Sequence, residues 1–176
     1  MLSILPVFTL IAQEAKKVQE PEYIGVVFFL DPGGTLTPLE RQESNAAFKV
    51  KAMGFGGGKG SIVYKGGKSP VRFKVGQELQ FVVRLHVPAG IEPDGFVNLD
   101  VLKASKNERS ITTMKVGAMG IGGAKSQKGE ALRALNFSKY GEDSLKVSPV
   151  QPLEAGEYVI TSRGGRGSFL FGIDKK

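Results

Sequence analysis

The sequence predicts an all-β protein built as an antiparallel β-sandwich of about 8–11 strands. Apolar and polar residues alternate along many short segments, turns rich in glycine separate these segments, and no long helical pattern lies between them. Glycine accounts for 24 of the 176 residues, and glycine is a poor helix former. A chain of this length is expected to form one domain.

The chain starts with an apolar run that we expect to be a targeting signal. Residues 2–12 carry no charge and have the length of a secretory h-region, too short to span a bilayer. The run is atypical, because no Lys or Arg precedes it and Leu10 stands three residues before the expected cleavage site. We predict a signal peptide over residues 1–12, a linker over residues 13–22 and a single domain over residues 23–176. The protein is then secreted or periplasmic, with no transmembrane span.

Strand patterns follow one another along the domain. In one of them Phe48 and Val50 share a face, and Lys49 and Lys51 share the other. D-P-G-G at 31–34 predicts a turn into a strand over 35–39, although T-P-L-E at 37–40 also has the form of a helix start. The expected strands are Tyr23–Leu30, Phe48–Met53, Ser61–Tyr64, Val71–Val75, Leu79–Val87, Phe96–Lys103, Ser110–Val116, Leu132–Phe137, Ser144–Val147, Tyr158–Ser162 and Ser168–Ile173.

The C-terminal segment contains P-L-E-A-G-E-Y, in which Gly156 precedes Tyr158 by two residues at the start of an apolar strand. This pattern resembles the tyrosine corner of immunoglobulin-like sandwiches, where the hydroxyl bonds to backbone across the corner. The ending L-x-x-G-E-Y … F-G-I-D is similar to that of uncharacterised exported bacterial proteins of β-sandwich type. The resemblance implies an immunoglobulin-like fold and no known activity, and an ordinary hairpin start is the alternative interpretation.

One internal repeat joins a strand to a glycine-rich segment. Residues 48–60 and 114–126 match at eight of 13 positions, at an offset of 66. Neither copy fits the P-loop, and lysine stands at the third glycine position of the dinucleotide-binding motif. The repeat predicts either two structurally equivalent strand ends or a pair of loops that contact a ligand, and it gives no reason to expect a cofactor.

The positive charge of +7 is concentrated in one part of the chain. Seven basic residues and no acidic residue lie between Ser44 and Gln77, and alternation places them on outward strand faces. Their partner could be an anionic polysaccharide or lipid head groups, and a solvated face is the simpler interpretation; nucleic acid is disfavoured by export and by the lack of Trp. The candidate ligand-binding residues are Lys49, Lys51, Lys59, Arg72, Lys74 and Lys125.

Catalysis has little support in the sequence. His86 is the only histidine and there is no cysteine, so we expect no metal site and no cysteine nucleophile. The sequence favours an exported, non-enzymatic binding or envelope-associated module. Two alternatives are an exported hydrolase whose carboxylates converge only in the fold, and a polyanion-binding protein that uses its basic surface. The acidic residues considered for the hydrolase are Asp31, Asp94, Asp100, Glu157 and Asp174.

Overall fold

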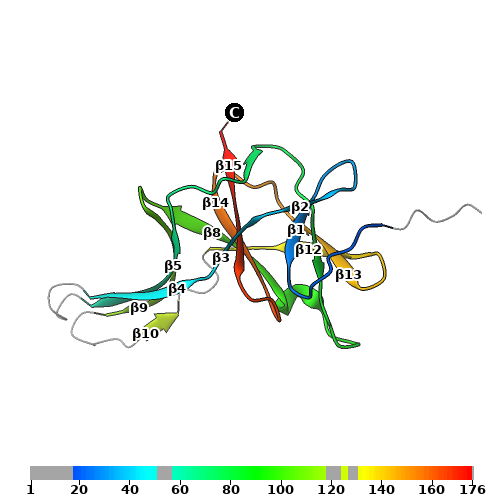
Figure 1. The fold of residues 1–176 in the computed structure, drawn as a ribbon. Coiled ribbons are helices and arrows are strands. Elements are labelled where there is room, and N and C mark those ends of the chain that lie inside the picture. The colour runs from blue at the N-terminus through cyan, green and yellow to red at the C-terminus, as the bar shows by residue number, and fades with distance from the viewer. Residues whose placement is uncertain (1–17, 51–56, 118–123, 127–130, 176) are drawn as a thin grey trace, which may run out of the picture.

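Two β-sheets pack face to face, and four strands of the larger sheet extend from the sandwich as an arm (Figure 1). The computed structural model describes residues 18–50, 57–117, 124–126 and 131–175. The predicted all-β, antiparallel sandwich is confirmed. The predicted signal peptide over residues 1–12 lies outside the described residues.

The smaller sheet has five strands in the order β12-β13-β7-β1-β2. The turn between β1 and β2 is closed by Asp31, whose carboxylate accepts a hydrogen bond from the backbone N–H of Thr35 at 2.8 Å. Residues 36–38 therefore continue as a strand and do not begin a helix. The strands of this sheet are β1 (Val27–Leu30), β2 (Leu36–Pro38), β7 (Phe81–Arg84), β12 (Leu135–Tyr140) and β13 (Ser144–Pro149).

The larger sheet has ten strands, seven of them in the order β3-β15-β14-β8-β9-β5-β4. At its margins β6 pairs with β15, β10 with β9, and β11 with β8; β6 is parallel to its partner. The strands are β3 (Glu40–Gln42), β4 (Asn45–Val50), β5 (Gly58–Lys65), β6 (Arg72–Lys74), β8 (Val97–Ala104), β9 (Glu108–Val116), β10 (Ala124–Ser126), β11 (Leu132–Arg133), β14 (Gly156–Ser162) and β15 (Ser168–Asp174).

The described residues thus contain fifteen strands, more than the sequence predicted. Strand β2 is the strand predicted over 35–39, and the predicted strand Leu132–Phe137 is divided into β11 and β12. Among the described strands, β3 and β10 have no predicted counterpart, and each has three residues. Alternation over so few residues gives no pattern that can be told from a loop. Ten of the described strands have at least four residues, and this number falls within the predicted range of 8–11.

The main core lies between the inner faces of the two sheets. Aromatic side chains form its centre: Phe81 on β7 lies near Phe171 on β15, with ring centroids 5.2 Å apart, and Tyr158 stacks on Phe171 at 5.5 Å. A second, smaller core covers the outer face of the larger sheet, where Tyr64 packs with Val159 and Leu170. The strands β14 and β15 are therefore apolar on both faces, as expected for strands buried on both sides.

The arm begins at the point where the pairing partner of β8 changes from β11 to β9. Leu99 and Asp100 pair with β11, whereas Lys103 and Ala104 pair with β9. Strands β9 and β5 then continue away from the sandwich and, with β4 and β10, form the four-stranded sheet that projects to the left in Figure 1. We call these four strands the arm.

A buried ion network fastens the base of the arm to the sandwich. Arg109 on β9 is fully buried and forms two hydrogen bonds of 2.8 Å to the carboxylate of Glu40 on β3. Its guanidinium also lies 3.6 Å from the carboxylate of Glu157 on β14. Glu157 is paired in turn with Arg72 on β6, which also binds Asp174. Charges from five strands therefore meet at this junction.

Candidate functional site

Four lysines lie side by side across the arm. The strand register places Lys49 opposite Lys59, Lys59 opposite Lys115, and Lys115 opposite Lys125. Residues directly opposite one another project from the same face of a sheet, so all four ammonium groups share one face. Neighbouring strands are about 4.8 Å apart, so the row is about 15 Å long. We call these four residues the lysine row.

The internal repeat produces this arrangement. At the offset of 66, Lys49 corresponds to Lys115 and Lys59 corresponds to Lys125. Each copy contributes one antiparallel pair, β4 with β5 and β9 with β10, and these pairs lie side by side. Val50, Gly58, Val116 and Ala124 form the adjacent row, so the strand ends that flank the two glycine-rich segments lie at one end of the arm.

The opposite face of the arm is apolar. Phe48 and Val50 lie on this face with Met114, because alternate residues of a strand point to opposite sides. The ring of Phe48 lies over Gly58, where a Cβ atom would overlap it. A side chain at position 58 would have to displace this ring, so glycine allows the close packing of Phe48 on β5 and accounts for part of the glycine-rich pattern. Phe48 and Val50 are nevertheless 55% and 56% exposed, because the arm extends beyond the sandwich.

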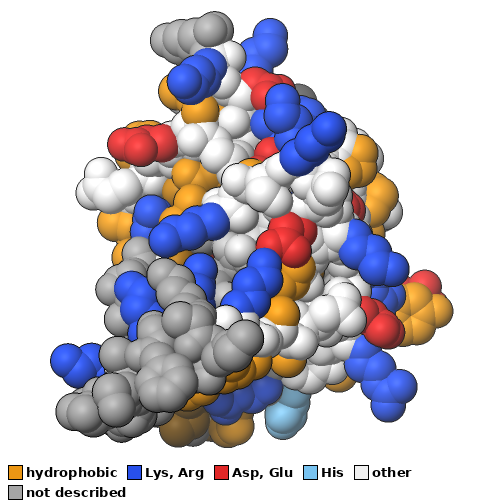
Figure 2. Space-filling view, turned by 90° about the vertical axis from the view of Figure 1, so that its left-hand side faces the viewer, with side chains coloured by type: hydrophobic (Ala, Val, Ile, Leu, Met, Phe, Trp, Pro, Cys, Tyr) orange, Lys and Arg blue, Asp and Glu red, His pale blue; other side chains and the backbone are white. Residues whose placement is uncertain are grey.

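Little negative charge balances the lysine row. The one ion pair it makes among the described residues joins Lys49 to Glu108 at 3.3 Å. These two side chains are 73% and 39% exposed, so this pair contributes little to stability. Figure 2, which looks onto the side from which the arm extends, shows many basic and few acidic side chains. Like charges directly opposite one another destabilise a sheet, so the row is an unfavourable arrangement for the free protein.

The other candidate residues lie elsewhere. Arg72 is not available to a polyanion, because it is paired with Glu157 and lies 2.6 Å from Asp174. The hydrogen bonds between Arg72 and Asp174 raise the pKa of the guanidinium and lower the pKa of the carboxyl. Lys74 is exposed on β6, which does not belong to the arm, and Lys51 lies outside the described residues. Sequence reasoning omitted Lys115, which the offset of the repeat would have added to Lys49.

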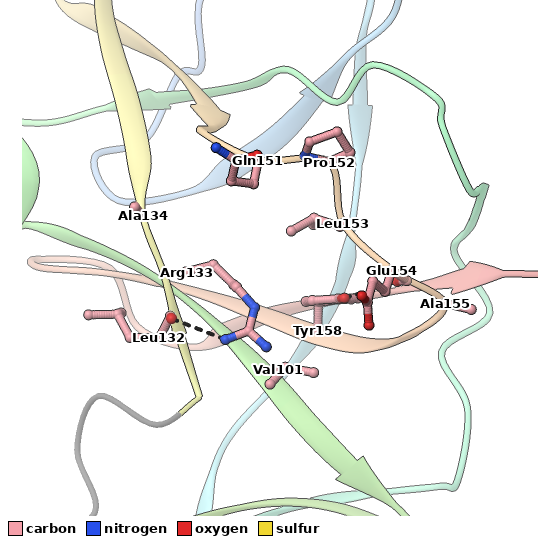
Figure 3. Close-up of a pocket in the computed structure, with 10 residues that line it drawn as sticks. All are labelled: Val101, Leu132, Arg133, Ala134, Gln151, Pro152, Leu153, Glu154, Ala155 and Tyr158. Carbon is pink, nitrogen blue, oxygen red and sulfur yellow. Dashed lines mark hydrogen bonds between the residues drawn. The ribbon is translucent and has the colours of Figure 1, made fainter.

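Tyr158 has the geometry of a tyrosine corner. Its side chain is buried, and its hydroxyl donates a 2.9 Å hydrogen bond to the carbonyl of Glu154, four residues upstream. Burial raises the pKa of the phenol. Gly156 begins strand β14 beside the ring, and a Cβ there would touch Tyr158. The corner borders a pocket of about 310 Å³ that is lined by β8, β11 and β14 of the larger sheet and by the loop before β14, and Arg133 projects into it (Figure 3).

A larger hollow of about 460 Å³ lies in the angle between the arm and the sandwich. Ile62 and Ile111 line it from the arm, and Asp100 and Val159 line it from the sandwich. Burial raises the pKa of Asp100, and the nearby charge of Arg133 opposes this shift.

The carboxylates considered for hydrolysis are dispersed. Asp31 closes a turn, Asp94 lies in a short 3₁₀ helix, and Asp100 lines the hollow beneath the arm. Glu157 and Asp174 do meet, but both bind the same guanidinium. His86, the only histidine of the chain, is exposed.

The comparisons with known proteins found no similar family. No family model matches the chain, and no curated protein or solved structure is significantly similar to it. Within the described ranges there is no cluster of three or more metal-ligating His, Cys, Asp or Glu residues. The same part of the chain contains no helix with the length and apolar character needed to cross a membrane.

Proposed function

We propose that this protein is an exported, non-enzymatic binding module that holds polyanions on the lysine row of its arm. The observation that supports the proposal is the register that sets Lys49, Lys59, Lys115 and Lys125 directly opposite one another. In the proposal, residues 1–12 direct export and the sandwich is a rigid support for the arm.

The lysine row is suited to a ligand with repeated negative charges. A row of about 15 Å with one positive charge per strand offers several contacts to a chain or surface that carries regularly spaced anionic groups. Binding such a ligand removes the repulsion among the lysines, so part of the binding free energy comes from relief of an unfavourable arrangement in the free protein. One isolated anion would relieve much less of it.

Anionic polysaccharides and anionic lipid head groups are the ligands we favour. Both present repeated sulfate, carboxylate or phosphate groups to a flat basic surface. Single-stranded nucleic acid is less suitable, because it is usually bound by stacking bases on aromatic rings. The chain has no Trp, and the ring of Tyr64, the tyrosine of the arm, is buried against the sandwich. The exposed ring of Phe48 lies on the face of the arm opposite the lysine row, so a strand bound to the lysines could not stack its bases on it.

The test measures binding to immobilised heparin, and to vesicles with and without phosphatidylglycerol, over a range of salt concentrations. Affinity should fall steeply with salt, because neutralised charges release counterions. The double substitution Lys59→Gln with Lys125→Gln removes two of four charges. By analogy with nucleic acids, the slope of log affinity against log salt should then decrease by about 1.5–2.

A matched control separates the row from the overall charge. Lys74→Gln with Lys139→Gln makes the same change in net charge at exposed lysines outside the arm. This variant should keep nearly all of the affinity. If both double variants lose equal affinity, or if wild-type binding does not depend on salt, the lysine row is not the binding site.

A further inference from the structure

The tyrosine corner forms one wall of a pocket to which the arm contributes no residue. The pocket has a volume of about 310 Å³, which lies at the lower end of the range for small-molecule sites. Both apolar and polar residues line the pocket. Figure 3 shows the Arg133 side chain extending into the space between the corner and strand β8. The lining residues include Val101, Arg133, Ala134, Leu153, Glu154 and Tyr158.

The wall formed by the corner is rigid. Tyr158 is 2% exposed, stacks on Phe171 at 5.5 Å, and is tied to the carbonyl of Glu154 by its hydroxyl. Leu153 in the same loop is buried in the main core. The ring of Tyr158 and the backbone of the loop that precedes it are therefore both held in place. The pocket is then present before any ligand binds, which reduces the entropic cost of binding.

Arg133 supplies hydrogen-bond donors that the described residues only partly use. One terminal nitrogen, Nη1, donates to the carbonyls of Ala131 and Leu132 at 3.3 and 3.2 Å. Within the described residues, no carboxylate lies within 4.0 Å of this guanidinium, and Nε and Nη2 have no acceptor. A half-buried guanidinium has five N–H donors in a planar fork that fits the two oxygens of a carboxylate.

We propose that this pocket binds the carboxylate of a small acid with a short aliphatic body. The carboxylate would accept hydrogen bonds from Nε and Nη2 of Arg133, and the aliphatic part would contact Val101, Ala134 and Leu153. The acid could be a free molecule or the C-terminal residue of a peptide, since the recognised group is the same. This site uses strands β8, β11 and β14 and does not depend on the lysine row.

Glu154 weakens the attraction of the pocket for any anion. Its exposed carboxylate lies on the pocket lining and repels a bound anion. The repulsion by Glu154 and the attraction by Arg133 both become about twice as large for a dianionic phosphate, so ligand charge alone does not select the anion. The planar fork of the guanidinium is the feature that fits the two oxygens of a carboxylate.

In the binding test, NMR of the full chain detects binding of isobutyrate and valerate, and of their neutral isosteres isobutyramide and valeramide. The acids should bind and the amides should not. A second pair of probes, a short peptide ending in Val with a free or an amidated C-terminus, distinguishes a peptide source from a free acid. Equal binding of acid and amide, or no binding of any acid, would overturn the proposal.

Substitutions then test whether Arg133 binds the carboxylate. Arg133→Gln should weaken acid binding at least about tenfold, since a hydrogen bond to a charged group is lost. Glu154→Gln should strengthen it by about two- to fivefold, because a nearby like charge is removed. Arg163→Gln, a matched change at an exposed arginine on the β14–β15 turn, should leave it unchanged. The melting temperature of each variant is measured alongside; loss of binding in a well-folded Arg133→Gln supports the assignment, and retained binding refutes it.

Discussion

The junction between the arm and the sandwich depends on one buried arginine. Arg109 is 0% exposed and makes four hydrogen bonds: two to Glu40, one to the carbonyl of Lys65 and one to the carbonyl of Gly66. The substitution Arg109→Met keeps a long apolar side chain of similar shape and removes every one of these donors. It leaves the carboxylate of Glu40, whose side chain is 14% exposed, without its cation.

We expect this change to lower the free energy of unfolding by about 3–5 kcal/mol, the range for removing one partner of a buried ion pair. Two stranded backbone carbonyls place the effect at the upper end of that range. A domain is typically stable by about 5–15 kcal/mol, so the loss is a large fraction of the total. Amide exchange should also become faster along the arm, because Arg109 connects β9 to strand β3 of the sandwich.

The loss should depend on pH in a defined direction. Burial raises the pKa of Glu40, but hydrogen bonds from Arg109, Ser69 and Gln42 outweigh it and hold the pKa below its ordinary value. A depressed carboxyl pKa stabilises the fold above the unfolded-state pKa, and this stabilisation is lost as the pH falls through the folded-state pKa. Without Arg109, burial dominates and Glu40 takes up a proton more readily. The difference in stability between the wild type and the variant should therefore shrink from pH 7 to pH 4.

The assay is urea denaturation followed by circular dichroism at both pH values, with the double variant Arg109→Met, Glu40→Met as the control. Removing both charges leaves no stranded carboxylate, so most of the lost stability should return. A single-variant loss below about 1 kcal/mol would refute the argument. So would a double variant that is as unstable as the single one, because the penalty would then not come from an unpaired charge.

Three further substitutions test other parts of the fold by the same denaturation assay. Tyr158→Phe removes the corner hydrogen bond and should cost about 1 kcal/mol; no loss would mean that the hydroxyl does not stabilise the corner. Asp100→Asn should stabilise the protein at pH 7 but not at low pH. The raised pKa of Asp100 makes stability fall as the pH rises above the unfolded-state value, so the variant should have a flatter pH profile. Gly25→Ala should cost more than about 2 kcal/mol, because Gly25 has φ +76° and a Cβ there would overlap the backbone of Gly165. Gly34→Ala is its control, with φ +85° and nothing within 4 Å; an equal loss in both would leave only the backbone conformation as the cause.

The sequence predicted the sandwich because alternation and turn residues record local geometry. The strand beginning at Phe48 shows both the success and the limit of that pattern. Lys49 does lie on the face opposite Phe48 and Val50, as alternation requires. Alternation does not say whether an apolar face will be covered, and here the arm carries Phe48 beyond the sandwich, so the ring is more than half exposed.

The role of Arg72 could not be predicted from the sequence. Its alternation with Phe73 indicated a solvent-facing cation, and one face of β6 is indeed apolar. Its acidic partners lie 85 and 102 residues further along the chain, on β14 and β15. Which charge meets which depends on strand order, and a one-dimensional pattern contains no information about it.

The strongest competing explanation for the lysine row is protection of sheet edges, since lysines on edge strands hinder association between sheets. In the described part of the chain, β4 and β10 are the outer strands of the arm, so this explanation suits Lys49 and Lys125. It does not apply to Lys59 and Lys115, which lie on inner strands paired on both sides.

The two explanations predict different results for two double variants. If the lysines only protect edges, Lys49→Gln with Lys125→Gln should self-associate in analytical ultracentrifugation, and Lys59→Gln with Lys115→Gln should behave as the wild type in every assay. If the row binds a polyanion, both variants should lose heparin affinity to a similar extent. The inner pair should then also gain stability, because each like-charged cross-strand contact that is removed returns about 0.2–1 kcal/mol. If the variant Lys59→Gln with Lys115→Gln binds heparin as tightly as the wild type, polyanion binding is refuted. Edge protection would then explain the outer lysines, and the inner lysines would have no explanation. If this variant is more stable than the wild type and binds heparin less tightly, the inner lysines reduce the stability of the free protein and increase its affinity for the polyanion.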